Sequence, residues 1–252
     1  GGCRAGGGRA RGGEAGYIGS GAGWVSPSPA WRARVQAARV GPLSVAIHAR
    51  RLAGLQPGSA VGILGAGPIG LCTLLSVRAL GPCRAFVTDL LDNRLGLAKR
   101  CGADWTGVPT RGDAVADILQ EETGGLDCVF ECAGEQAALD QAVELLKPGG
   151  LLVLAGIPEG DQIHFRADAL RRKELRLQNV RRHTDCPQEA IAIEASGAVG
   201  GAPVATQQSG WDTPAPYPVI TTRLPLVTQS ILGRRRVARR GGGQYNLARI
   251  HI

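Results

Sequence analysis

The chain of 252 residues contains no methionine, even at position 1, and only three lysines, Lys99, Lys147 and Lys173. The missing initiator is compatible with a fragment or a processed product. No apolar run approaches the roughly 20 residues that a membrane-spanning helix needs. The first residues also lack the charged-then-apolar pattern of a secretory signal. We therefore expect a cytoplasmic protein with no membrane partner.

Closely paired cysteines are also lacking. The seven cysteines form no Cys-x-x-Cys pair, and several lie in apolar stretches, where reduced, buried thiols are common. This disfavours both a disulfide framework and a zinc site built from cysteines. The four histidines, His48, His164, His183 and His251, show no metal-ligand spacing either. Because a catalytic zinc needs about three protein ligands, we expect no metal site.

The net charge of +8 does not lie in the part of the chain with the clearest pattern. Residues 55–197 contain 14 Lys and Arg against 19 Asp and Glu, whereas the two flanks contain 15 against 2. The densest basic run comprises Arg234, Arg235, Arg236, Arg239 and Arg240. It comes with no aromatic stacking platform and no known nucleic-acid-reading motif. We interpret it as a solvated arm and expect no nucleic-acid partner.

Between residues 55 and 197, short strands that are apolar throughout alternate with amphipathic helices. We predict strands at 61–64, 85–88, 128–130, 151–155 and 175–180, and helices at 42–54, 68–80, 93–101, 113–123, 135–147 and 187–195. This alternation is typical of an α/β fold with a doubly wound parallel sheet covered on both faces. Outside it, we expect most of residues 1–23 to be poorly ordered, 198–217 to be a linker or an insertion and 218–226 to form one strand.

A glycine-rich turn follows the first of these strands. Its G-x-G-x-x-G spacing favours a dinucleotide-binding turn only in the right context, which here is an apolar strand before it and a helix after it. The first glycine allows the tight turn, the second lets a pyrophosphate approach the backbone, and the third lets helix and strand pack closely. Unpaired backbone N–H groups and the helix dipole would then face the phosphates. The residues are Gly65, Ala66, Gly67, Pro68, Ile69 and Gly70.

An acidic residue, Asp89, ends the second strand 19 residues after Gly70. A carboxylate at this place accepts hydrogen bonds from the ribose hydroxyls and repels a 2′-phosphate, which predicts NAD rather than NADP as the cofactor. The alternative, that Asp89 caps the helix at 93–101, is weaker because Asp92 suits that role better. Arg94 is either a contact of the adenosine end or a surface arginine.

These residues together resemble the coenzyme domain of the medium-chain dehydrogenase/reductase family, and its zinc-dependent polyol branch of sorbitol, butanediol and threonine dehydrogenases in particular. The order and spacing of the similar strings are more specific than any single motif. They are PLSVAIHA (42–49), LGAGPIGL (64–71), VTDLLDNRLGLAK (87–99), ECAG (131–134), LKPGGLLVLAGIP (146–158), RKELRLQNVRR (172–182) and PVITTRLPL (218–226).

The resemblance implies cofactor contacts that spacing alone does not. Ile69, Asp89 and Arg94 match positions that hold the adenosine half in relatives. Three further segments would line the groove or lie near the nicotinamide: Cys132, Ala133 and Gly134; Ala155, Gly156 and Ile157; and Val180, Arg181 and Arg182. For Cys132, a thiol packed in a strand-end turn is an equal alternative.

The chain also departs from its relatives. They carry a GroES-like catalytic domain with a cysteine zinc ligand and a Gly-His-Glu motif, whereas about 40 residues precede PLSVAIHA here and contain neither. Gly41 stands where many relatives have Glu, and Thr222 where His is common. We therefore interpret residues 1–54 as a partial catalytic-domain remnant with a connecting helix, 55–197 as the Rossmann domain, and 198–252 as an irregular basic tail that partly returns to the catalytic domain.

Two functional hypotheses follow. By resemblance, the chain belongs to an oxidoreductase that transfers a hydride between a secondary alcohol or polyol and NAD. Without the zinc half, we expect NADH binding but little or no alcohol oxidation by this chain alone. The alternative is an NAD-binding module without chemistry. Relatives often pair their sheet edges across a two-fold axis, so a homo-oligomer is among the expected assemblies.

Overall fold

The computed structural model describes residues 16–20, 24–28 and 34–196, with side chains from Arg39 to Ser196, and four short strands of the tail. These four are β9 (Gln207–Ser209), β10 (Ser230–Leu232), β11 (Arg235–Val237) and β12 (Tyr245–Leu247). The strand predicted at 218–226 lies outside the described residues. Of the helices that are described, none combines the length and the apolar character needed to cross a membrane.

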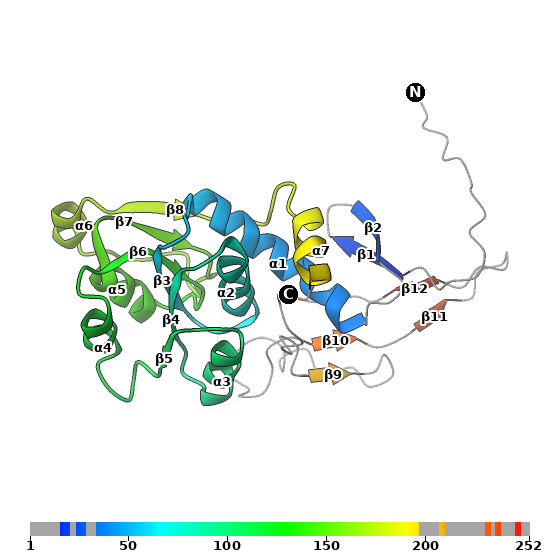
Figure 1. The fold of residues 1–252 in the computed structure, drawn as a ribbon, viewed down its shortest axis with the longest axis horizontal. Coiled ribbons are helices and arrows are strands. Elements are labelled where there is room, and N and C mark those ends of the chain that lie inside the picture. Colours follow the sequence, from blue (N-terminus) through cyan, green and yellow to red (C-terminus); the bar gives the residue numbers. More distant parts are fainter. Residues whose placement is uncertain are drawn as a thin grey trace, which may run out of the picture.

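A parallel sheet of six strands forms the centre of the fold (Figure 1). Its spatial order is β5-β4-β3-β6-β7-β8, which confirms the doubly wound sheet. The winding reverses between β3 and β6, so a crevice is expected outside the carboxyl ends of these two strands. The strands are β3 (Ala60–Leu64), β4 (Arg84–Thr88), β5 (Trp105–Gly107), β6 (Leu126–Glu131), β7 (Leu146–Leu154) and β8 (Arg176–Asn179).

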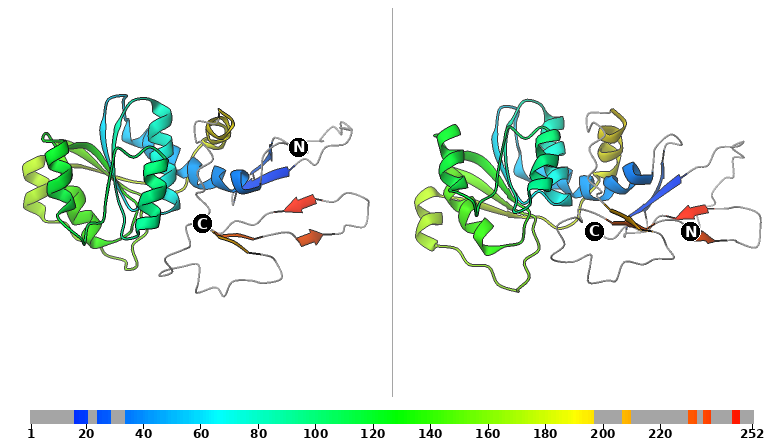
Figure 2. Two further views of the ribbon diagram at one scale, coloured as in Figure 1. Left: turned by 60° about the horizontal axis from the view of Figure 1, so that its bottom comes forward. Right: turned by 90° about the horizontal axis from the view of Figure 1, so that it is seen from below.

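Helices cover both faces of this sheet, as Figure 2 shows from two directions. One face packs against α1 (Arg34–Ala53), α2 (Pro68–Leu80), α3 (Asp92–Arg100) and α7 (Pro187–Ser196). The other packs against α4 (Ala114–Glu121), α5 (Gln136–Leu145) and α6 (Ala167–Lys173).

The apolar strands are explained by these two layers of helices. In β3, Val61 and Ile63 join the core under α2, while Leu64 joins the core under α5. In β6, Phe130 and Val129 divide in the same way. Phe130 is fully buried, and burying a side chain of this size stabilises the fold by about 1.5–3 kcal/mol. Successive side chains of a strand point to opposite faces, so a strand position between the two helical layers is apolar on either face, whereas the edge strand β8 is largely exposed and more polar.

The prediction of a helix starting at Pro42 was wrong, because α1 begins at Arg34 and contains Pro42 in its interior. Proline lacks the N–H that an interior helical position donates, which normally ends or kinks a helix. Here Val40 and Leu43, on either side, are buried against the sheet's helical layer. Their burial offsets the lost hydrogen bond. Local helix signals in the sequence do not show this burial.

Two other local predictions need correction, and two elements were not predicted. Asp92 is the first residue of α3 rather than its cap, since Leu91 occupies the cap position and makes no side-chain cap. Residues 16–20, expected to be poorly ordered, form β1 (Gly16–Ser20), which pairs antiparallel with β2 (Trp24–Ser28). The strand β5 and the helix α6 were not predicted, because β5 has only three residues and α6 buries none of its seven.

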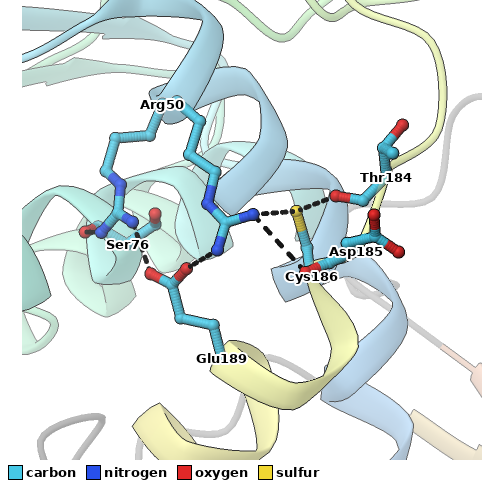
Figure 3. A network of polar contacts seen from close by, with 7 residues as sticks. Arg50, Ser76, Thr184, Asp185, Cys186 and Glu189 are labelled. Carbon is cyan, nitrogen blue, oxygen red and sulfur yellow. Dashed lines mark hydrogen bonds and ion pairs between the residues drawn. The ribbon is translucent and has the colours of Figure 1, made fainter.

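A polar network fixes α7 on α1 (Figure 3). The carboxylate of Glu189 accepts hydrogen bonds from Arg50 and Arg51, which are consecutive on α1. Arg50 also donates to the carbonyl of Ser76 on α2, 3.0 Å away. Although burial raises it, the pKa of Glu189 is held below its ordinary value by these two guanidinium groups. The network therefore ties the last helix of the domain to the helix that enters it.

Candidate functional site

The predicted cofactor residues gather at one edge of the sheet. They follow the carboxyl ends of β3, β4, β6, β7 and β8, and in a parallel sheet these ends lie side by side. Backbone hydrogen bonds connect them across the strands. The N–H of Gly65 donates to Thr88 at 2.8 Å, that of Cys132 to Leu64 at 2.8 Å, and that of Val180 to Leu154 at 3.0 Å. The sequence-predicted residues thus form one continuous rim.

The first and third glycines of the turn are required by close packing. Gly65 has a φ of +103°, and a Cβ there would lie 2.9 Å from the backbone nitrogen of Ala133. A Cβ on Gly70 would overlap the carbonyl oxygen of Gly65. Because the obstructing atoms belong to the backbone, a larger side chain at either place forces the main chain to move. These contacts hold the start of α2 against β3 and the turn after β6.

The second glycine faces open space instead. Gly67 is the N-cap of α2 with φ −71° and ψ −171°, and no protein atom lies within 4 Å of where its Cβ would be. The first α-helical hydrogen bond runs from Leu71 to the Gly67 carbonyl, at 2.9 Å. In the described part of the chain, the N–H groups of Ile69 and Gly70 have no protein acceptor. An open approach to free amides at the positive end of a helix suits an anion such as a diphosphate.

The carboxylate of Asp89 is tied directly to this turn. Its Oδ2 accepts a hydrogen bond from the N–H of Ala66 at 2.7 Å, and its Oδ1 accepts one from Leu91 at 2.9 Å. Arg94 lies 3.5 Å from Oδ2. A carboxylate offers about four acceptor sites, so Asp89 retains capacity for a further donor. These two hydrogen bonds hold the carboxylate between the glycine turn and the turn after β4.

A second acid, Glu131, ends β6 in the same way that Asp89 follows β4. Its side chain is only 2% exposed, and its Oε1 accepts hydrogen bonds from Ala133 at 2.7 Å and Gly134 at 2.6 Å. Burial raises the pKa of this carboxyl, and the surrounding backbone N–H groups oppose that rise. Glu131 was not predicted as a site residue, although it closes an apolar strand in the same way as Asp89, which was predicted.

The other predicted residues differ in their exposure to solvent. Cys132 is half-buried beside the core, which favours the packed-thiol alternative, and burial raises the pKa of its thiol. Ile157 is 90% exposed, which is unusual for an apolar side chain. Arg181 and Arg182 are exposed, and Arg182 has a positive φ of 58°. Among the described residues, no hydrogen bond or ion pair joins these two arginines to the glycine turn, so their place in the site rests on the resemblance.

Metal ligands are a separate question. Within the part of the chain that the structure describes, no three His, Cys, Asp or Glu side chains are grouped so that they could hold a metal ion. His48 and His183 do lie close enough to interact, since the pKa of His183 is lowered by burial and by His48. Two imidazoles without a third ligand do not make a zinc site. The described residues therefore do not fit a catalytic zinc.

The comparisons with known proteins agree with this geometry. The family model described as zinc-binding dehydrogenase matches residues 68–195. Sorbitol dehydrogenase of Bacillus subtilis is 33% identical over 174 residues, which cover 69% of this chain and 49% of that protein. The chain thus spans about half the length of the curated relatives it matches.

Two solved structures extend the comparison. A zinc-binding dehydrogenase homologue from Sinorhizobium meliloti, bound to NADP, superposes with a TM-score of 0.69 at 29% identity, covering 74% of this chain and 56% of that one. The 2R,3R-butanediol dehydrogenase of Bacillus subtilis superposes with a TM-score of 0.68 at 25% identity, covering 75% and 54%.

Proposed function

Because the chain belongs to the zinc-binding dehydrogenase family, we propose that residues 55–197 bind NAD(H) along the carboxyl edge of the sheet. The observation that supports this proposal most strongly is that the open helix start at Gly67 and the carboxylate of Asp89 lie at the same turn. Open space and free amides lie at the start of α2, and a carboxylate is bonded to the same turn through Ala66. Diphosphate and ribose hydroxyls are the neighbouring groups of a dinucleotide that would use these two features.

Different residues of the chain would hold different parts of the cofactor. The amides of Ile69 and Gly70 would hold the diphosphate, with the helix dipole of α2 adding a favourable field. Asp89 would accept the hydroxyls of the adenosine ribose. When bound, NAD supplies the hydride acceptor for the oxidation of an alcohol.

The choice of NAD over NADP rests on the charge at Asp89. A 2′-phosphate would bring its negative charge beside this carboxylate, which the chain has already fixed between Ala66 and Leu91. Like charges at about 4 Å repel by several kcal/mol even in the screened surroundings of a protein surface. Arg94, which approaches the same carboxylate, is the residue that would favour NADP, and the Sinorhizobium homologue holds NADP. We propose that the carboxylate dominates.

The reaction of the whole protein is proposed to be hydride transfer between a secondary alcohol or polyol and NAD. Its support is the similarity to sorbitol and butanediol dehydrogenases. The described residues do not fit a catalytic zinc, so no step through zinc is assigned to them. We therefore propose that this chain alone binds the cofactor with little alcohol oxidation. The same observation favours the alternative of a dinucleotide-binding module without chemistry.

We also propose a substrate class and a cellular compartment. The substrate would be a small alcohol or polyol, by analogy with the relatives. All six described cysteines are free thiols, which fits the reducing conditions of the cytoplasm. Residues 55–197 carry an excess of acidic side chains, so we propose no nucleic-acid role for this domain.

Calorimetric titration with NADH and NADPH tests the cofactor assignment. We expect NADH to bind at least about tenfold more tightly, because tenfold requires only about 1.4 kcal/mol of the repulsion at Asp89. Asp89→Ser should reduce that discrimination. Asp92→Ser is the matched control, since it removes an exposed acid three residues away and should leave the preference unchanged. Tighter binding of NADPH would refute the NAD assignment, and binding of neither would refute the site.

Catalysis is tested separately with sorbitol or butanediol and NAD. We expect no NADH production above background and no zinc at one ion per chain in elemental analysis. Turnover at a rate typical of enzymes would show that the chain holds a complete active site.

A further inference from the structure

The buried acid at the end of β6 is not used by the proposed function and has an unusual set of partners. Glu131 receives hydrogen bonds from the backbone N–H groups of Ala133 and Gly134. Burial raises the pKa of this carboxyl, and the backbone of Glu135 and Gly156 helps to oppose that rise. No lysine or arginine is paired with Glu131 among the ion pairs of the described residues. Its charge is held by the main chain of two loops.

These two loops meet backbone to backbone at the carboxylate. Gly134 has a φ of +74°, and a Cβ there would overlap the carbonyl of Ile157. A Cβ on Gly156 would overlap both Oε2 of Glu131 and the nitrogen of Gly134. The N–H of Gly156 also donates to the Glu131 carbonyl at 2.8 Å. Glu131 therefore joins the turn after β6 to the turn after β7.

The direction of the cofactor follows from the topology. The diphosphate belongs at the start of α2, next to the reversal between β3 and β6, and Asp89 places the adenosine ribose on the β4 side. The other nucleotide half must then extend over β6 and β7. The exposed side chain of Ile157 lies on that side, beside Gly134, and offers an apolar contact for an aromatic ring.

We propose that Glu131 is a positioning residue that preforms the nicotinamide side of the groove by locking the two loops together. It does not touch the cofactor, and it acts through the backbone of Ala133, Gly134 and Gly156. The inference rests on the proposed binding of a dinucleotide at this edge. It predicts that loss of the carboxylate weakens binding of the nicotinamide half selectively.

Glutamine at this position isolates the charge from the size of the side chain. Glu131→Gln keeps nearly the same volume but replaces one acceptor oxygen with an NH₂ donor. That NH₂ group would face backbone N–H groups, and two donors cannot bond to each other. The hydrogen bonds that one carboxylate oxygen accepts are therefore lost. Glu131→Asp is the second variant, because it retains the charge while drawing it away from the loops by one methylene.

The test compares two ligands by calorimetry on the full chain. ADP-ribose carries the adenosine, diphosphate and ribose but no nicotinamide, whereas NADH carries all of them. For Glu131→Gln we expect NADH affinity to fall by about tenfold while ADP-ribose affinity changes by less than about threefold. Glu131→Asp should show the same selective loss to a smaller degree.

Glu194→Gln is the matched control, because Glu194 is another buried acid, 5% exposed, but it pairs with Arg39 of α1 and not with backbone N–H groups of the rim. It should leave the ratio of the two affinities at the wild-type value. Equal losses for both ligands in the Glu131 variants, or an unchanged ratio in whichever variant folds, would overturn the inference. If the wild-type chain binds ADP-ribose and NADH equally, the nicotinamide side is not preformed and the inference fails alone. If it binds neither, the proposed function fails and this inference with it.

Discussion

Replacing Gly67 by serine separates the stability of the fold from its use of the helix terminus. The backbone at Gly67 is extended, and no protein atom lies within 4 Å of the new Cβ. Serine is a preferred N-cap, and its hydroxyl can accept from the N–H of Ile69 or Gly70. Serine also restricts the unfolded chain more than glycine does. We expect the free energy of unfolding to stay the same or rise by up to about 1 kcal/mol.

The same change should strongly weaken cofactor binding. The serine side chain would fill the space through which a diphosphate approaches and would compete for its amides. Loss of two charge-assisted hydrogen bonds, at about 1.5 kcal/mol or more each, lowers the affinity by about 100-fold or more. Urea denaturation measures the stability, and calorimetry with NADH measures the binding.

Gly124→Ala is the control for this experiment. Gly124 is equally open, but it precedes β6 and so lies at the opposite edge of the sheet. It should leave NADH binding unchanged. If Gly67→Ser binds NADH as well as the wild type does, the phosphate is not held at this helix terminus and the reasoning is refuted.

Three further predictions concern the frame of the site. Gly70→Ala should lower the free energy of unfolding by about 1–3 kcal/mol in urea titrations, because its Cβ would overlap the Gly65 carbonyl; unchanged stability would contradict the close packing. Lys173→Met should lower stability by about 1–3 kcal/mol, since its ammonium donates to three carbonyls around the end of α5; a neutral result would show that water replaces it. Glu189→Gln should destabilise the fold above pH 4.5, the ordinary pKa of Glu189, and the difference from wild type should vanish as the pH falls through the lowered folded value. A difference that persists in more acidic urea titrations would mean that the arginine pairing is not its cause.

The parts of the fold that the sequence predicted are those in which local pattern and tertiary environment agree. The helix at Pro68–Leu80 was predicted with its observed bounds, because Gly67-Pro68 and Gly81 mark its ends and its apolar residues lie inward. The doubly wound parallel sheet was predicted from alternation and handedness, and the structure confirms it. By contrast, β5 is stabilised mainly by pairing with β4 at the sheet edge, which three residues cannot signal.

For the candidate site, the sequence predicted the rim but not its internal connections. That Gly65, Asp89 and Gly134 meet at one edge follows from parallel strands. That Asp89 bonds to Ala66, and that the turn after β7 meets Glu131 and Gly134, depends on contacts between segments far apart in the chain. Such contacts produce no periodic pattern in the sequence. The extension of α1 through Pro42 was missed for a related reason, because Pro42 was interpreted as a helix start and the burial of its neighbours was not visible in the sequence.

The most direct test of dinucleotide binding at the glycine turn is an NMR titration of the isotopically labelled chain with NADH. The amide resonances of Ala66, Gly67, Ile69 and Gly70 should show the largest shifts, followed by those around Asp89. Saturating NADH that leaves these amides unperturbed, or that shifts a different set, would contradict the account.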